Sequence, residues 1–81
     1  MKAHYTERLL RSYAAAPADI RKAFDKQAGL LLLNLRHPSL RAEKYDEAAG
    51  VWQARVSRGW RFYFAVEGET YHILEMTPHP K

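Results

Sequence analysis

Residues 51–67 read VWQARVSRGWRFYFAVE and alternate between apolar and polar side chains on both sides of a short break. Trp52 and Ala54 alternate with polar neighbours before the break, and Phe62 and Phe64 do so after it. A period of two indicates strands that bury only one face. The stretch therefore predicts an antiparallel β-hairpin whose second face is polar.

The loop of this hairpin decides which residues face each other. A loop of residues 58–60 keeps apolar residues on one face, whereas a two-residue loop would set Val56 against Arg61 and mix the faces. We therefore predict the three-residue loop, with Gly59 at positive φ. The predicted pairs are Ser57 with Arg61, Val56 with Phe62, Arg55 with Tyr63 and Ala54 with Phe64. The polar face then carries Gln53, Arg55, Ser57, Arg61 and Tyr63.

The first half of the chain has a helical pattern. Residues 7–15 predict a short helix, and Pro17 suits the first turn of a second one. The second helix has apolar positions at three- and four-residue spacing, namely Ile20, Phe24, Ala28, Leu31 and Leu35. It should end near Arg36 or His37, because Pro38 disfavours a helical residue before it. Before these helices, residues 2–6 predict a short strand.

The last strand, Thr70 to Met76, follows a turn at Glu67-Gly68 and has two possible registers. One pairs Phe64 with Tyr71 and Phe62 with Ile73, which places His72 and Leu74 on the arginine face. The other, shifted by one residue, buries His72, Leu74 and Met76. The sequence leaves both open. The prolines at 78 and 80 should stop the pairing and hold His79 in an extended stub.

These elements predict one α+β domain over residues 1–81, with a helical hairpin packed on one face of a small antiparallel sheet of three to four strands. The chain has no Cys, which excludes disulfides and thiolate metal sites. We also expect no metal and no cofactor, because the Gly and His spacings match no nucleotide or zinc motif. Without a long apolar run or a secretion signal, the chain should be cytoplasmic, with no membrane partner.

The net charge of +4 favours a nucleic acid or an acidic protein as partner. Cationic and polar groups gather around the hairpin and the C-terminus; they are Arg55, Arg58, Arg61, His79 and Lys81, with Tyr63 and Gln53 nearby. A planar guanidinium can hold two phosphate oxygens, and a histidine can move protons near neutral pH. This set suits RNA cleavage without a metal, in which the 2′-hydroxyl attacks its own phosphate. A plainer interpretation pairs the arginines with Glu43, Asp46, Glu47 or Glu75 and leaves His79 solvated.

The order of features over nearly the whole chain resembles the RelE/ParE superfamily of bacterial toxin–antitoxin toxins. The resemblance rests on residues 5–10, the Ala16-Pro17 break, the helix from Ile20 to Leu35 and its exit at residues 35–38, the strands at 50–56 and 60–64, and the ending Pro78-His79-Pro80-Lys81. That ending is similar to the branch in which a C-terminal His works with the strand Arg.

The resemblance implies a ribosome-dependent endoribonuclease that cuts translated mRNA and is neutralised by an antitoxin protein. Arg61 would hold the scissile phosphate, and His79 would be a general acid or base. Arg55 would contact phosphate or ribosomal RNA, Glu43 or Lys44 would supply a second proton-transfer group, and Lys81 would add charge. The products would be a 2′,3′-cyclic phosphate and a 5′-hydroxyl.

Two departures and two alternatives accompany the resemblance. Pro80 stands where relatives with the C-terminal His often have Tyr, so Tyr63 or Tyr71 would have to take over any tyrosine contribution. The lysine-rich catalytic set of other relatives is missing from the central strands. The same fold also includes ParE-type gyrase poisons that need no RNA-cleaving residues. The other alternative is a non-toxic interaction domain.

Overall fold

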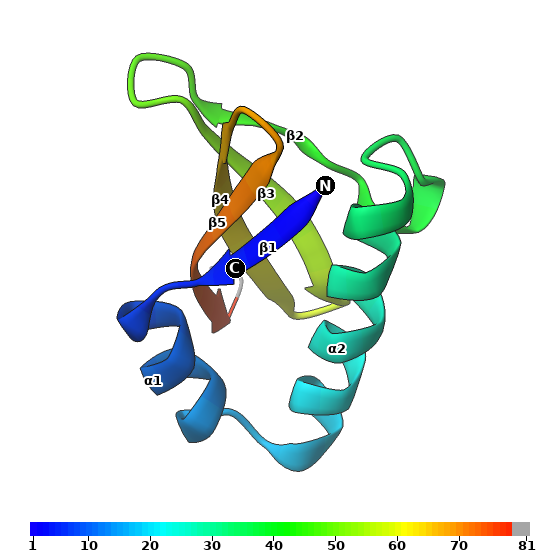
Figure 1. Ribbon diagram of the computed structural model, residues 1–81. Helices are drawn as coiled ribbons and strands as arrows, with labels where there is room; N and C mark the ends of the chain where they lie inside the picture. The colour runs from blue at the N-terminus through cyan, green and yellow to red at the C-terminus, as the bar shows by residue number, and fades with distance from the viewer. Residues whose placement is uncertain (79–81) are drawn as a thin grey trace.

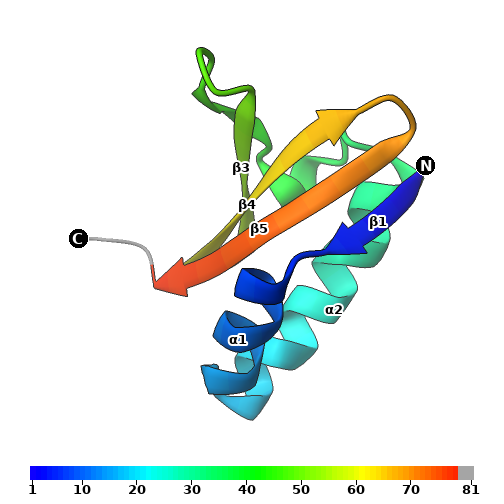
Figure 2. The same cartoon turned by 60° about the vertical axis from the view of Figure 1, so that its left-hand side comes forward.

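The computed structural model describes residues 1–78. In chain order its elements are β1 Lys2–Tyr5, α1 Glu7–Ala15, α2 Ala18–Leu33, the short 3-10 helix η1 Pro38–Leu40, β2 Glu43–Asp46, β3 Val51–Ser57, β4 Trp60–Glu67 and β5 Thr70–Pro78. The strands form one five-stranded sheet in the order β1-β5-β4-β3-β2. Both helices lie on the same side of it (Figure 1, Figure 2). The α+β architecture with helices on one face is thus confirmed.

The sheet is larger than predicted, and it is mixed. β1 runs parallel to β5, with His4 opposite His72, so the expectation of a purely antiparallel sheet of three to four strands was wrong. At the other edge, β2 pairs antiparallel to β3 and all four of its residues are exposed. A strand without a buried face has no apolar alternation to reveal it, and charges on an edge strand discourage pairing with other chains.

The β3–β4 hairpin has the predicted faces but a different register. Arg55 lies opposite Arg61 and Ala54 opposite Phe62, and the pairing is irregular between Arg55 and Ser57. Ser57 pairs with Trp60, so the loop has two residues rather than three. The shift of two residues before the bulge keeps Gln53, Arg55, Arg61 and Tyr63 on the predicted face. Beyond the bulge, Ser57 lies opposite Trp60, which packs on the core, and not opposite Arg61 as predicted. Positive φ occurs at Gly50 and Gly68, not at Gly59.

Neither register proposed for β5 is observed, although each assigns part of the strand to the correct face. Phe64 pairs with Ile73 and Phe62 with Met76, and a bulge separates these two pairs. Ile73 and Met76 are therefore both buried, while His72 stays only half-buried. The turn lies one residue later than predicted, between Glu67 and Thr70. A bulge reverses the alternation, so no single register could have been correct.

The first helix has the predicted bounds, whereas the second ends early. Thr6 caps α1 by accepting a hydrogen bond from the Leu9 N–H at 3.1 Å. α2 ends at Leu33, because Asn34 takes an extended conformation and its side chain accepts from the Arg36 N–H at 2.9 Å. Asparagine side chains compete with helical hydrogen bonds in this way. The end predicted from Pro38 was therefore too late by about one turn.

The core lies between the helices and the covered face of the sheet. Its largest fully buried side chains are Phe62, Phe64, Leu9, Leu31, Leu40, Ile73 and Met76. α1 packs mainly on β5, and α2 packs on β3. The opposite face of β3 and β4 has no helix over it, and it presents the polar set predicted from the sequence. No helix in residues 1–78 has both the length and the apolar character needed to cross a membrane.

Candidate nucleic-acid interface

Two arginines lie directly opposite each other on the uncovered face of the sheet. Arg55 in β3 pairs with Arg61 in β4, and both are half-buried. Like charges directly opposite in a sheet destabilise it. The repulsion between the two arginines therefore destabilises the sheet. An anion bound between them would offset this repulsion.

Hydrogen bonds near the end of the hairpin hold the guanidinium of Arg61 and the backbone of Arg55. Arg61 Nη1 donates to the carbonyl oxygens of Ser57 at 3.2 Å and Trp60 at 3.1 Å. The carbonyl of Arg55 accepts from Nε2 of the buried Gln27 at 2.8 Å. A guanidinium has five N–H donors, so Arg61 keeps most of them for a ligand.

Within residues 1–78, no carboxylate lies within 4.0 Å of either guanidinium. Glu75 pairs instead with Arg8 at 3.0 Å, and Glu43 accepts a hydrogen bond from Gln53 Nε2 at 2.6 Å. The plainer interpretation, in which acidic neighbours neutralise Arg55 and Arg61, is therefore not what the described residues do. Among residues 1–78, neither positive charge is paired with a carboxylate.

A second row of side chains runs across the sheet beside the arginine pair. Glu43, Gln53, Tyr63 and Glu75 lie opposite one another in β2, β3, β4 and β5. Residues two apart on a strand share a face and lie about 7 Å apart. Glu43 thus lies on the same face as the arginines, in the neighbouring row of the sheet. Gln53 and Tyr63 also lie where the sequence predicted.

Lys44 lies apart from this group. It pairs with Trp52, and its Nζ lies 5.9 Å from the centre of the Trp52 ring, which stacks on buried Phe64. Because neighbouring residues of a strand point to opposite faces, Lys44 and Glu43 cannot serve the same site from β2. Of the two residues proposed for proton transfer, only Glu43 is placed near the arginines. Arg58 is exposed in the hairpin loop.

An aromatic pair that the sequence analysis missed lies on the same face. Tyr45 of β2 packs against Tyr63 with ring centres 4.9 Å apart, and Tyr45 is 61% exposed. Both rings line a hollow of about 280 Å³ together with Arg8, Leu74 and Thr77. Exposed aromatic rings are surfaces on which bases stack. Only the unrecognised strand β2 could have revealed Tyr45, as the residue two beyond Glu43.

His79 and Lys81 lie outside the described residues. The last two described residues, Thr77 and Pro78, pair with Arg61 and Trp60. The other histidines have local roles. His37 caps η1 by accepting from the Ser39 N–H, and His72 lies beside His4 with 2.9 Å between their Nδ1 atoms. Residues 1–78 hold no group of three or more potential ligands arranged for a metal ion.

Comparison with solved structures identifies the fold. The YoeB/ParE toxin from Agrobacterium tumefaciens superposes with a TM-score of 0.80 over 99% of this chain and 100% of its own, at 17% identity. The archaeal RelE-RelB complex from Pyrococcus horikoshii contains a chain with a TM-score of 0.81 at 13% identity, covering 99% of this chain and 96% of that one. The chain has the RelE/ParE-like fold.

A third structure has a higher sequence identity. The toxin-antitoxin complex RelBE2 from Mycobacterium tuberculosis matches with a TM-score of 0.75 at 23% identity, over 99% of this chain and 92% of that one. No protein-family model matches the chain, and no curated protein sequence matches it either. The likeness is thus one of fold, as the resemblance in sequence order predicted.

Proposed function

We propose that this protein is the toxin of a toxin–antitoxin pair and that it cleaves translated mRNA as a ribosome-dependent endoribonuclease. The observation that carries the proposal is the Arg55–Arg61 pair, two arginines directly opposite each other whose guanidinium groups have no carboxylate within 4.0 Å among the described residues. A phosphodiester is a ligand that such a pair fits. The RelE and YoeB structures of the same fold support the toxin assignment.

The reaction needs a base, an acid and a group that stabilises charge. The 2′-hydroxyl gives its proton to a base and attacks the phosphorus, and the 5′-oxygen leaves with a proton from an acid. Arg61 would stabilise the negative charge that builds on the phosphate oxygens, with Arg55 holding the neighbouring oxygen. Glu43 is the base that the sheet offers beside them, and His79 is the proposed acid. A cyclic 2′,3′-phosphate and a 5′-hydroxyl result.

The proposed partners are the ribosome with its mRNA and a cognate antitoxin. Complexes with a second protein recur among the solved structures, as the RelE-RelB and RelBE2 complexes illustrate. An antitoxin that covers the arginine face would both block the site and neutralise its charge. Co-expression of a short neighbouring reading frame should then restore growth to cells that express this chain.

The test is to express the protein in growing bacteria and to map the 5′ ends of messages on ribosomes. The wild type should produce new ends at the ribosomal A site, with 5′-hydroxyl groups. Arg61→Ala and His79→Ala should each lower the rate by about 10²–10⁴-fold, the range for one positioned proton-transfer or charge-stabilising group. Arg11→Ala, on the exposed side of α1, is the matched control and should cleave normally.

Two outcomes would contradict the proposal. Intact messages in cells that the wild-type protein inhibits would exclude cleavage. Inhibition that persists in His79→Ala, together with accumulating DNA cleavage complexes, would assign a gyrase poison instead. Thermal unfolding of each variant separates loss of activity from loss of fold.

A further inference from the structure

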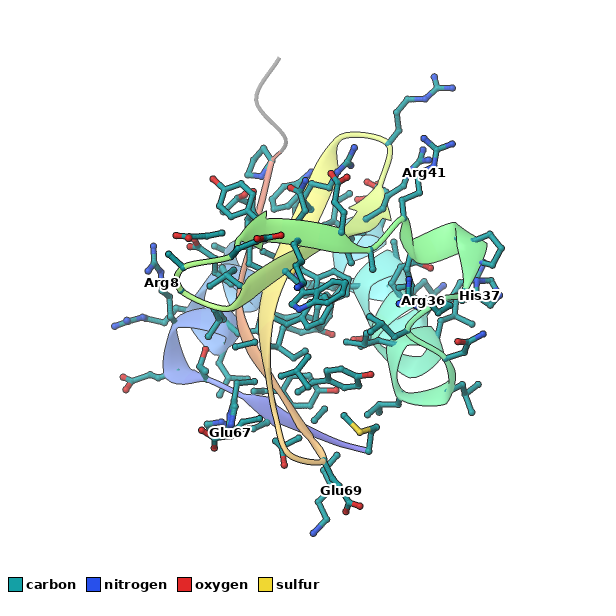
Figure 3. The ribbon with its side chains drawn as sticks, turned by 90° about the horizontal axis from the view of Figure 1, so that it is seen from above. Arg8, Arg36, His37, Arg41, Glu67 and Glu69 are labelled. Atoms are coloured by element: carbon teal, nitrogen blue, oxygen red, sulfur yellow. The ribbon has the colours of Figure 1, made fainter. Side chains whose placement is uncertain are left out.

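A cationic cleft lies beside the arginine pair, at the junction of α2, η1 and β3. It has a volume of about 420 Å³, and its lining includes Lys26, Arg41 and Arg55, with no carboxylate. The sequence analysis assigned nothing to Lys26 or Arg41. Both are exposed, and the labelled acids Glu67 and Glu69 lie on the far side of the molecule from Arg41 (Figure 3).

Arg41 has a backbone conformation that arginine rarely takes. Its φ is +46°, and it is the sole residue other than glycine with positive φ within residues 1–78. The conformation ends η1 and turns the chain into β2, and the Arg41 N–H donates to the Pro38 carbonyl at 3.3 Å. Glycine would make the same turn without strain. Residues with a strained backbone are frequent at binding sites, where the function of the side chain explains why the strain is retained.

The floor of the cleft is rigid. Gln27 is only 5% exposed, and its Nε2 donates to the carbonyls of Ser39 at 3.0 Å and Arg55 at 2.8 Å. Its Oε1 accepts from the Ser39 hydroxyl at 3.3 Å. One side chain of α2 thereby ties η1 to β3 and fixes the cleft walls. A preorganised cleft loses little entropy when a ligand enters.

We propose that this cleft binds an RNA phosphodiester next to the one held by Arg55 and Arg61, through Lys26 and Arg41. The inference rests on the proposed function, because RNA is the substrate there. Arg55 lines the cleft and is also a member of the arginine pair, so the cleft adjoins the proposed catalytic site. An acidic peptide is the less suitable occupant, since the lining has no aromatic or large aliphatic side chain to hold a peptide.

The test measures binding without cleavage. The probe is a labelled single-stranded RNA with 2′-O-methyl riboses, which lack the attacking hydroxyl, and fluorescence anisotropy follows its binding at about 50 to 200 mM salt. Each phosphate contact on a single strand adds about 0.7 to the slope of log affinity against log salt. Arg41→Gly and Lys26→Gln should each lower that slope by about 0.7 and weaken binding several-fold.

Two further variants and two further measurements make the result specific. Arg41→Lys keeps the charge and should keep the slope. Arg36→Gln removes an arginine of the neighbouring α2–η1 connection that does not line the cleft, and it should bind like the wild type (Figure 3). Thermal unfolding of Arg41→Gly should be unchanged or raised, because glycine relieves the strain. A hairpin RNA as a second probe distinguishes message from ribosomal RNA by which form binds more tightly.

Unchanged slopes in Arg41→Gly and Lys26→Gln would overturn the inference, as would an acidic peptide that displaces the RNA and loses affinity in the same variants. The outcome is separable from that of the proposed function. Lowered slopes with no message cleavage by the wild type would support the cleft and reject the nuclease. Message cleavage with unchanged slopes would do the reverse.

Discussion

Phe62 and Tyr63 are neighbours on β4, yet they belong to two different surfaces. Phe62 faces the helices and is 0% exposed, and its ring lies 5.4 Å from that of Phe24 in α2. Tyr63 faces away from the helices, half-buried, in the row that includes Glu43. The covered face holds the fold together. The open face carries two arginines directly opposite each other, an arrangement that adds nothing to the buried core.

The largest effect should come from the covered face. Phe62→Ala should lower the free energy of unfolding by about 3–5 kcal/mol, because the lost ring leaves a cavity among fully buried neighbours. Chemical denaturation measures this change. Tyr63→Ala is the control on the open face and should cost much less. Equal losses in the two variants would contradict the division into two surfaces.

The next effect concerns Gln27, the side chain of α2 that connects η1 to β3. Gln27→Leu should lower stability by about 1–3 kcal/mol, because the partly buried carbonyls of Ser39 and Arg55 lose their donor. Denaturant midpoints would give the stability, and hydrogen exchange would reveal loosening of η1. Gln27→Glu tests the same position with similar shape. If Gln27→Leu were as stable as the wild type, the hydrogen bonds of Gln27 would not contribute to the stability of the fold.

A gain in stability is expected on the open face. Arg55→Thr removes one of two opposed positive charges and introduces a residue that favours strands, so it should raise stability by about 0.2–1 kcal/mol. The same change should lower RNA affinity. Thermal unfolding together with anisotropy measures both. If the variant lost stability as well as affinity, Arg55 would support the fold. The division between a structural face and a binding face would then be wrong.

The sequence predicted which residues face each surface, but not how the strands align. Alternation in β3 and β4 correctly placed Arg55 and Arg61 on the open face. The predicted register was wrong by two residues, and a shift of two does not change the face on which a side chain lies. The bulges in β3–β4 and β4–β5 have no sequence signal of their own. β2 escaped notice because all its residues are exposed, which also hid Tyr45.

The missed parts of the candidate site have the same origin. Gln27 is polar on the buried stripe of α2, and its partners are backbone carbonyls that no side-chain pattern reveals. Arg41 owes its place to a left-handed turn after η1, where sequence rules expect glycine. Contacts made by the backbone depend on tertiary structure, whereas alternation of side chains is local. The sequence therefore predicted which side chains lie on each face of the sheet, but not the hydrogen bonds that connect the elements.

The smallest effect is expected from a contact between α1 and α2. The Tyr13 hydroxyl donates to both carboxylate oxygens of Asp25, at 3.0 and 3.1 Å. That hydrogen bond, followed by burial and by the Asp25 charge, raises the pKa of Tyr13 above its ordinary value of 10.0. The folded protein thus holds this proton more tightly than the unfolded chain does. The resulting stabilisation is complete below pH 10.0 and is lost as the pH rises through the raised pKa.

Tyr13→Phe removes both the hydrogen bond and the titration. The wild type should be the more stable protein at neutral pH, and its advantage over Tyr13→Phe should shrink once the pH exceeds 10.0. Denaturant unfolding of both proteins at a series of alkaline pH values measures the difference. An advantage that stays constant through this range would show that the Tyr13–Asp25 contact does not join the helices in solution. The contact between α1 and α2 would then rest on other interactions, such as that between the Tyr13 and Phe24 rings.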